Sequence, residues 1–250
     1  MNTADSSLAA PFADLEKDRH LLGRSTTAER VAGVLRERIA SGQLAPGTRL
    51  VEEAIGEALG VSRNSLREAF RLLAHERLLT HELNRGVVVR TLTEQDVVEL
   101  YRVRRLIELA ALRGLGDPED LEPDGRDRLA KLADAVYDAE QAATRGNWQD
   151  VGTADLRFHR ALVELAGSAR IEEFMAQILA ELRLVFHVMK DPRHFHEPYI
   201  ARTREILEAL ENGDPVFAEQ LLEQYLDDAE GQLVHAYVEE GRFGGARHFR

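Results

Sequence analysis

The chain lacks cysteine, and it lacks any long apolar run. With no cysteine among 250 residues, disulfides, iron–sulfur clusters and thiolate zinc sites are excluded, so that any metal would have to be held by His, Asp or Glu. No stretch of about eighteen consecutive apolar residues occurs, as a membrane-spanning helix would need. The start of the chain has only a short apolar run around 8–12, followed by acids. We therefore expect a cytoplasmic protein with no membrane partner.

Positive charge is scarce, and it is unevenly placed. The formal net charge is −12, yet residues 24–91 hold 11 Arg, no Lys and 8 Asp or Glu, a balance of +3. Residues 1–23 carry −2, which leaves −13 for 92–250. Only the arginine-rich segment could approach a polyanion without strong repulsion. We therefore divide the chain into a domain at 24–91 that could bind a polyanion such as DNA and an acidic domain at 92–240. We expect the tails at 1–23 and 241–250 to be flexible.

The arginine-rich segment has the order of a winged helix-turn-helix: three helices plus a β-hairpin wing. Thr26 with Glu29 forms a capping-box pattern before a helix that ends near 41–42. The run VEEAIGEALG is a short helix closed by Gly60, and Ser62 suits the N-cap of a third helix, SRNSLREAFRLLAHERLL, with 66, 70, 73 and 78 inward. Two β-prone runs around 84–86 predict the hairpin.

The third helix carries the residues suited to reading DNA. Residues in the first two turns of such a helix reach base edges in the major groove, and an Arg side chain can bind guanine or phosphate with two parallel hydrogen bonds. Arg63 and Arg67 lie one turn apart there, and Arg85 lies at the hairpin tip. The alternative is a solvated surface whose arginines pair with Glu68 and Glu76. Arg71, one turn further on, suits a phosphate or the interface between the domains.

These residues also carry a family resemblance. The stretch RLVEEAIGEALGVSRNSLREAFRLLAHERLL, followed by NRG, resembles the DNA-binding domain of the GntR family of bacterial transcription regulators. The resemblance implies double-stranded operator DNA as a partner. Asn64-Ser65 differs from the Thr-Pro or Thr-Thr common at that place, so the base preference stays open. Our predicted DNA contacts are Arg49, Ser62, Arg63, Asn64, Ser65, Arg67, Arg85 and Gly86.

The acidic part has helical periodicity and no convincing strand. Thr93 suits the N-cap of its first helix. Gly, Asp and Pro punctuate six expected helices, at roughly 96–115, 119–145, 148–167, 169–190, 197–212 and 215–240. We therefore expect a mainly α protein, in which the winged domain is followed by an all-helical antiparallel bundle of about six helices.

Several polar residues fall on the inward stripes of these helices. Arg104 lies within the stripe of Leu100, Val103, Ile107 and Ala111. Asp155 and His159 are neighbours at i, i+4, and Thr203 and Tyr225 align with leucines. Because buried polar groups need partners, these residues together suggest a polar cavity. The predicted effector-binding residues are Arg104, Asp155, His159, Thr203 and Tyr225.

This part resembles the all-helical FCD effector domain of the FadR branch of GntR regulators, and its six helices resemble the VanR-type variant. In many such domains one Asp and three His hold a divalent metal. Here DLRFH supplies Asp155 and His159, but Thr203 and Tyr225 stand where the other two histidines would fall. We therefore expect a pocket for a small carboxylate or other polar molecule, with at most a weakly held zinc, nickel or manganese ion on Asp155 and His159. His187, or His194 and His196 in an expected loop, could substitute as ligands.

Two functional classes follow. The first is a ligand-responsive transcription regulator, not an enzyme, that binds a pseudo-palindromic operator as a homodimer. One short reading helix rarely recognises a specific site alone, and a two-fold symmetric dimer doubles the length of DNA that is read. The second is a helical-bundle metalloenzyme with an appended DNA-binding module. That class needs several Glu and His ligands on facing helices, and 96–240 contains no Glu-x-x-His pair.

Overall fold

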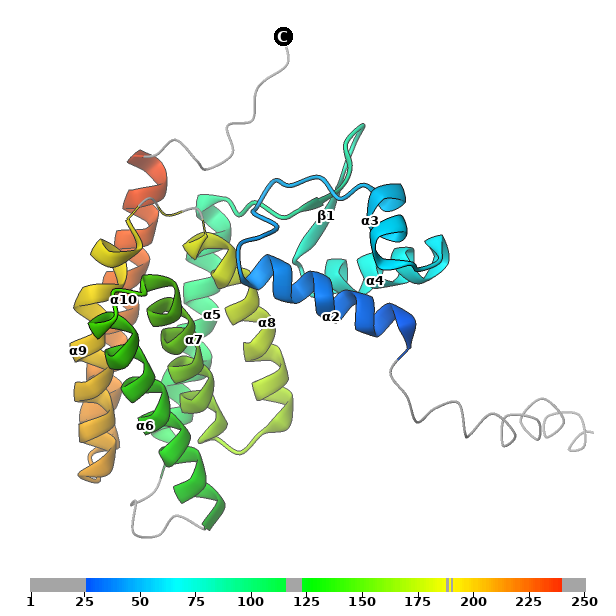
Figure 1. Ribbon diagram of the computed structural model, residues 1–250. Coiled ribbons are helices and arrows are strands. Elements are labelled where there is room, and N and C mark those ends of the chain that lie inside the picture. The colour runs from blue at the N-terminus through cyan, green and yellow to red at the C-terminus, as the bar shows by residue number, and fades with distance from the viewer. Residues whose placement is uncertain (1–25, 116–122, 188, 190, 240–250) are drawn as a thin grey trace, which may run out of the picture.

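The computed structural model describes residues 26–115, 123–187, 189 and 191–239, so the tails expected at 1–23 and 241–250 lie outside it. Within this part of the chain, nine helices and one two-stranded sheet form two adjoining units. In Figure 1 the N-terminal unit, coloured blue to cyan, lies beside one end of a helical bundle coloured green to red. The fold is mainly α, with a winged helix-turn-helix followed by a helical domain, as the sequence predicts.

The N-terminal unit, called the reading head below, has the predicted elements. They are α2 (Thr27–Ala40), α3 (Glu52–Leu59), α4 (Arg63–His75), β1 (Leu79–Glu82) and β2 (Gly86–Val89). The capping box of α2 is present: Thr26 Oγ1 accepts from the Glu29 amide at 3.1 Å, and Glu29 accepts from the Thr26 amide at 2.6 Å. Gly60 ends α3 with a left-handed φ of 62°. Leu78 is buried as expected, but it lies beyond the end of α4.

The wing is a hairpin supported along its second strand. β1 and β2 pair in antiparallel register with Glu82 opposite Gly86, so the loop consists of 83–85 and the turn lies one residue earlier than predicted. Asn84 takes the left-handed conformation there, with φ 65°, which Asn tolerates better than most residues. On the other edge of β2, the Leu50 amide donates to the Val87 carbonyl at 2.8 Å. The hairpin is thereby anchored to the segment that leads into α3.

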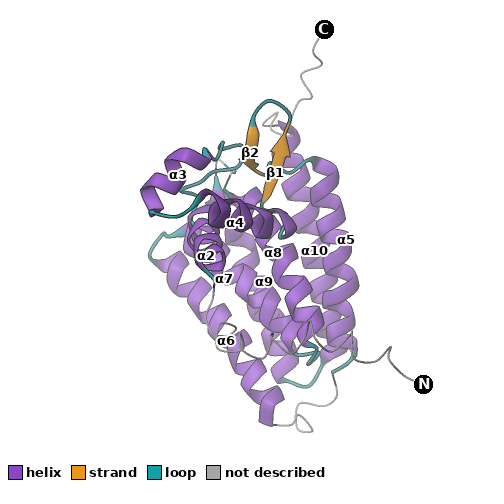
Figure 2. Ribbon diagram, turned by 90° about the vertical axis from the view of Figure 1, so that its right-hand side faces the viewer, coloured by secondary structure: helices purple, strands orange, loops and turns teal. Residues whose placement is uncertain are grey.

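The second unit, called the helical domain, contains the six expected helices. They are α5 (Glu94–Arg113), α6 (Pro123–Thr144), α7 (Trp148–Glu164), α8 (Ala169–Phe186), α9 (Pro192–Glu211) and α10 (Pro215–Glu239). Helix α6 packs along α7, and α10 packs against both α5 and α9. Figure 2 shows these helices side by side below the hairpin. Within the described residues, no helix is both long and apolar enough to cross a membrane.

Helix α9 begins five residues earlier than predicted, and the expected loop 192–196 is helical. Asp191 caps the helix by accepting from the His194 amide at 3.0 Å, and Pro192 occupies the first turn, where its missing N–H costs nothing. Pro198 lies inside the helix and cannot bond the carbonyl four residues earlier. That carbonyl, on His194, instead accepts from the Gln232 side chain of α10 at 3.3 Å. A contact remote in sequence therefore compensates for the proline inside α9, which we expected only in the first turn of a helix beginning at 197.

Candidate functional site

Helix α4 presents the predicted reading residues to solvent. Ser62 caps the helix by accepting from the Ser65 amide at 3.1 Å, so the N-terminal turn begins at Arg63 as predicted. Arg63 and Arg67 are 73% and 66% exposed, and Asn64 is exposed beside them. Leu66, Ala69, Phe70 and Leu73 cover the opposite side and hold the helix against the core of the reading head. The exposed first turns of α4 are available to a DNA groove.

Each reading arginine has an acidic neighbour. Arg67 Nε lies 3.0 Å from a carboxylate oxygen of Glu52 on α3, and Arg63 lies 3.8 Å from Glu53. Exposed ion pairs of this kind contribute only about 0–1 kcal/mol. DNA phosphates or base edges can therefore displace these carboxylates at little cost. The carboxylates also hold the two guanidinium groups near the N-terminus of α4 before DNA arrives.

The predicted wing residues form a second exposed group. Arg85 extends from the hairpin loop, bonds Glu82 at 2.6 Å, and donates to the Gly47 carbonyl at 3.4 Å. Arg49 is also exposed and bridges to Val88 on β2. Gly86 is exposed at the start of β2. Arg49 thus lies on the segment beside β2, and Arg85 reaches from the hairpin loop toward that same segment at Gly47.

Arg71 is not at the interface between the domains. Its side chain is 73% exposed and forms an i, i+3 ion pair with Glu68. Glu76, the other acid expected to neutralise α4, instead holds Arg36 of α2 through two hydrogen bonds of 2.6 and 2.7 Å. The solvated-surface interpretation therefore describes Arg71 better than it describes Arg63 or Arg67, whose acidic partners lie on another helix.

Inside the helical domain, an acid that we did not predict partners Arg104. Glu108, one turn further along α5, accepts from Arg104 Nε at 2.7 Å and contacts His159 Nδ1 at 2.7 Å. Arg104, Glu108 and His159 are each at most 1% exposed. Burial opposes ionisation of Glu108, but the charge of Arg104 and the contact with His159 outweigh it and lower the pKa of Glu108. Arg104 also stacks over the ring of Tyr101 at 4.7 Å.

The remaining predicted effector residues adjoin this buried cluster. The Tyr225 hydroxyl donates to Asp155 Oδ1 at 2.5 Å, and His159 Nε2 lies 3.8 Å from the same oxygen. Thr203 lies beyond Asp155 and donates to the Ile200 carbonyl of its own helix at 3.0 Å. Asp155 and Thr203 line a cavity of only about 10 Å³, enough for about one water molecule. The five residues are therefore neighbours, but they do not enclose one open pocket.

The donor set at this cluster does not fit a tightly held divalent metal. Burial raises the pKa of Tyr225 well above its usual value, and its hydroxyl donates to Asp155, so this phenol is a poor metal ligand at neutral pH. The Thr203 hydroxyl donates its proton to the Ile200 carbonyl and keeps that proton at neutral pH. The Glu108 carboxylate is already bonded to Arg104 and His159, which leaves the predicted pair, Asp155 and His159, and two protein ligands hold a transition metal weakly. Across the described part of the chain, no three His, Asp or Glu side chains are grouped closely enough to bind a metal.

His196, which we expected in a loop, lies buried on α9. Its ring packs edge-on against Phe186 and lies so near Gly152 that a Cβ atom there would come within 2.7 Å of Nε2. Burial lowers the pKa of His196 from 6.5 to about 4. The close approach to Gly152 explains why α7 has no side chain at that position. The residue therefore contributes to packing as a neutral ring.

We predict an acid-sensitive stability from His196. In the unfolded chain this imidazole takes up a proton near pH 6.5, whereas the folded protein excludes it until about pH 4, so stability falls as the pH drops through this window. Between pH 6.5 and 5 the loss attributable to His196 is about 2 kcal/mol. Chemical unfolding at both pH values should show a smaller pH dependence for His196→Leu. The exposed control His75→Gln should behave as the wild type, and equal pH dependence in all three proteins would contradict the prediction.

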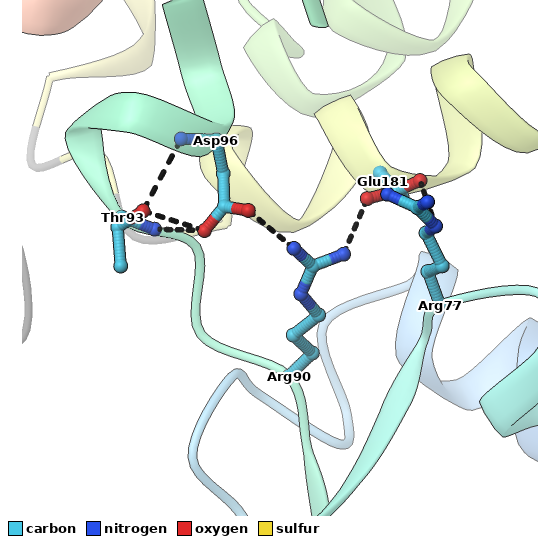
Figure 3. Close-up of polar contacts among 5 residues, drawn as sticks. All are labelled: Arg77, Arg90, Thr93, Asp96 and Glu181. Carbon is cyan, nitrogen blue, oxygen red and sulfur yellow. Dashed lines mark hydrogen bonds and ion pairs between the residues drawn. The ribbon is translucent and has the colours of Figure 1, made fainter. Parts of the chain in front are cut away.

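An ion-pair network joins the reading head to the helical domain (Figure 3). Arg90, just after β2, donates to Asp96 at the start of α5 and to Glu181 of α8. Asp96 also accepts from the Thr93 amide at 2.8 Å, which completes the predicted cap of α5. Arg77 of the reading head lies 3.9 Å from Glu181. The burial of Glu181 raises its pKa even with two arginines beside it. The network holds the segment between the two units in one arrangement.

The last turn of α2 makes a second connection. Arg183 Nε and His187 Nε2, both from α8 and its C-cap, donate to the Ala40 carbonyl at 3.0 and 2.7 Å. Gln149 of α7 donates to the Ser41 carbonyl at 2.9 Å. Carbonyls at a helix C-terminus have no partners within the helix and attract positive charge. Burial lowers the pKa of His187, so the ring that makes this contact is neutral. The orientation of α2 thus depends on α7 and α8.

A winged reading head joined by these contacts to an all-helical domain defines the chain as a DNA-binding transcription regulator with an effector-binding domain. Residues 27–89 match the family model described as "Bacterial regulatory proteins, gntR family", and residues 99–228 match the FCD domain. The chain belongs to the GntR family of bacterial regulators and carries an FCD domain of the FadR-like architecture.

Individual relatives agree with this assignment. A solved GntR transcriptional regulator from Rhodococcus sp. RHA1 has 46% sequence identity and a TM-score of 0.79, covering 85% of this chain and all of its own. The gluconate operon transcriptional repressor of Bacillus subtilis (strain 168) is 29% identical over 227 residues, 88% of this chain and 90% of its own. A protein of Paenarthrobacter nicotinovorans named "Probable D-xylose utilization operon transcriptional repressor" is 29% identical over 212 residues, 82% and 88% of the two chains. The relatives are regulators, so the chain is not an enzyme.

Proposed function

We propose that this regulator binds a pseudo-palindromic operator in the cytoplasm as a homodimer, and that a small polar effector, in particular a carboxylate, alters this binding. The exposed N-terminal turn of α4 carries the proposal: Arg63, Asn64 and Arg67 project there from a helix whose start is defined by the Ser62 cap. Arg49 and Arg85 extend the contact along the wing. One reading helix recognises a short half-site, so two copies are needed for a specific operator.

The proposed effector site is formed by Arg104, Asp155, His159, Thr203 and Tyr225. Arg104 Nη2 and His159 Nε2 are buried and have no hydrogen-bond partner among the residues that the structure describes. Leaving a buried donor unpaired costs about 1–3 kcal/mol, so an effector carboxylate that reaches Arg104 Nη2 gains this hydrogen bond. His159 Nδ1 donates to Glu108, so Nε2 of the neutral ring can accept from an effector hydroxyl. The cavity beside Asp155 holds about one water, so an effector can enter only if α9 moves relative to α7. Such a movement reaches the reading head through Gln149 of α7 and the contacts of α8.

The dimer and its operator geometry are testable together. We expect light scattering to give twice the monomer mass at micromolar concentration, free and on DNA. Footprinting on a selected operator should then show two protected half-sites whose centres are separated by about one helical turn, 10–10.5 base pairs. Titration with random DNA of equal length provides the control and should show much weaker, more salt-sensitive binding. A monomer in both states, or one protected half-site, would contradict the proposal.

A further inference from the structure

A cleft between the reading head and the helical domain has the composition of a ligand site. It lies between α2, α7 and α8, outside the cluster around Asp155, and has a volume of about 270 Å³. Small-molecule sites span about 300–1,000 Å³ and often lie at domain interfaces, so the cleft is close to the lower end of that range. Ile39 of α2, Leu156 of α7, and Ala176 and Leu179 of α8 give it a largely apolar lining.

Four arginines line the same cleft, and three of them are already neutralised. Arg36 forms two hydrogen bonds with Glu76, Arg157 pairs with an acid of α6 at 2.6 Å, and Arg160 pairs with an acid of its own helix at 3.2 Å. Arg183 differs, since within the described residues no carboxylate lies within ion-pair distance of it. A partly buried guanidinium without a counter-charge is electrostatically unfavourable. Arg183 is therefore the cation in this cleft that an incoming anion would stabilise most.

The geometry of Arg183 leaves part of its guanidinium available. Nε donates to the Ala40 carbonyl at 3.0 Å, and Nη2 donates to Thr153 Oγ1 at 2.6 Å. The third nitrogen, Nη1, has no hydrogen-bond partner within the described residues, and it is not sealed from solvent as Arg104 Nη2 is. The two existing bonds hold the group in one orientation, one toward α2 and the other toward α7. The remaining donor is thus fixed in place without being used.

We propose that this cleft binds an amphipathic carboxylate, with the carboxylate on Arg183 and the hydrocarbon chain along Leu156, Ala176 and Leu179. A phosphorylated or sugar-like ligand fits less well, because the lining is mainly apolar and three of the four arginines are paired. Arg183 already contacts the last turn of α2, so a ligand seated there touches both units at once. Binding would hold the reading head in its present orientation and change operator affinity. This last consequence rests on the proposed operator binding, but ligand binding itself does not.

Octanoate is the probe that tests the site, by calorimetric titration of the full chain. We expect the wild type to bind one octanoate per chain. Arg183→Gln should bind octanoate at least about tenfold more weakly, because the charge-assisted hydrogen bond is lost. Ala176→Phe should bind it as weakly, because the larger side chain fills the cleft while Arg183 is kept. Arg170→Gln, an exposed arginine on the same helix, is the matched control and should bind as the wild type. Octanol tests the need for the carboxylate and should bind far more weakly.

The outcomes separate this site from the rest of the protein. The proposal is overturned if Arg183→Gln and Ala176→Phe both bind octanoate with wild-type affinity. It is also overturned if the wild-type protein binds octanol as tightly as octanoate. A loss of octanoate binding in Tyr225→Phe, with Arg183→Gln unaffected, moves the ligand to the buried cluster and also overturns it. Operator titrations of the same wild-type protein without octanoate report DNA binding separately. Intact operator binding with no octanoate binding rejects the cleft and leaves the proposed function standing.

Discussion

Replacing Glu108 by Gln is expected to destabilise the helical domain by about 3–5 kcal/mol, because it leaves the fully buried Arg104 without its counter-charge. Gln keeps the shape and can still bond His159, so the loss reports on charge more than on packing. The measurement is chemical unfolding followed by circular dichroism. The reverse change is informative as well: in Arg104→Met combined with Glu108→Leu both charges are gone, and much of the lost stability should return.

The control for this prediction lies on the same helix. Glu99 pairs with Arg102, and both side chains are largely exposed, so Glu99→Gln should change the free energy of unfolding by no more than about 0.5 kcal/mol. If Glu108→Gln is as mild as this control, then Arg104 is not a buried charge that depends on Glu108. The cluster could then not supply an unpaired donor to an effector in the way we propose.

Removal of the reading arginines should abolish most specific DNA binding. Arg67→Ala is expected to weaken binding to the operator by about 1–3 kcal/mol, and Arg63→Ala with Arg67→Ala by about twice that, if each guanidinium contacts a base edge. Arg85→Ala should weaken operator and random DNA more evenly and reduce the salt dependence by about one charge. Fluorescence anisotropy titrations at several salt concentrations distinguish these two patterns.

Two further variants make this experiment specific. Arg30→Ala removes an exposed arginine of α2 that bonds Thr27 of its own helix, and it should leave operator affinity near the wild-type value. Glu52→Gln removes the acid that holds Arg67 and should strengthen DNA binding, since one negative charge is lost and Arg67 is released. Unchanged operator affinity in Arg67→Ala would remove α4 from the role of reading helix.

The reading head is the part that the sequence predicts best. Its signals are local: Thr26, Gly60 and Ser62 each end or begin a helix through contacts within a few residues, and all three function as expected. The family resemblance rests on this same stretch. Even the small shift of the hairpin turn follows from a local preference, because Asn84 accepts the left-handed conformation that places Gly86 in the strand.

The interior of the helical domain is predicted less well, for a geometric reason. We expected Val103 and Ile107 on the buried stripe of α5, but both are only partly buried, whereas Tyr101, Arg104 and Glu108 are fully buried. A helix offers several nearly equivalent apolar stripes, and its neighbours decide which one turns inward. Glu108 is one turn from Arg104 on the same helix, and the rotation of α5 turns both inward and brings Glu108 to His159 of α7. Nothing in the sequence around Glu108 distinguishes it from the solvated acids of the same chain.

Composition and local pattern were thus enough to predict a mainly helical protein with an arginine-bearing reading helix, because caps, turns and charge runs act over a few residues. The family resemblance added that it is a transcription regulator. Contacts between distant segments decided the rest. Gln232 satisfies the carbonyl that Pro198 leaves free, and Arg90 joins Asp96 to Glu181. Arg183 meets the end of α2 across 143 residues of chain. These pairings depend on how helices rotate and pack, which no single helix encodes, so the buried cluster and the cleft between the two units could be found only in the tertiary structure.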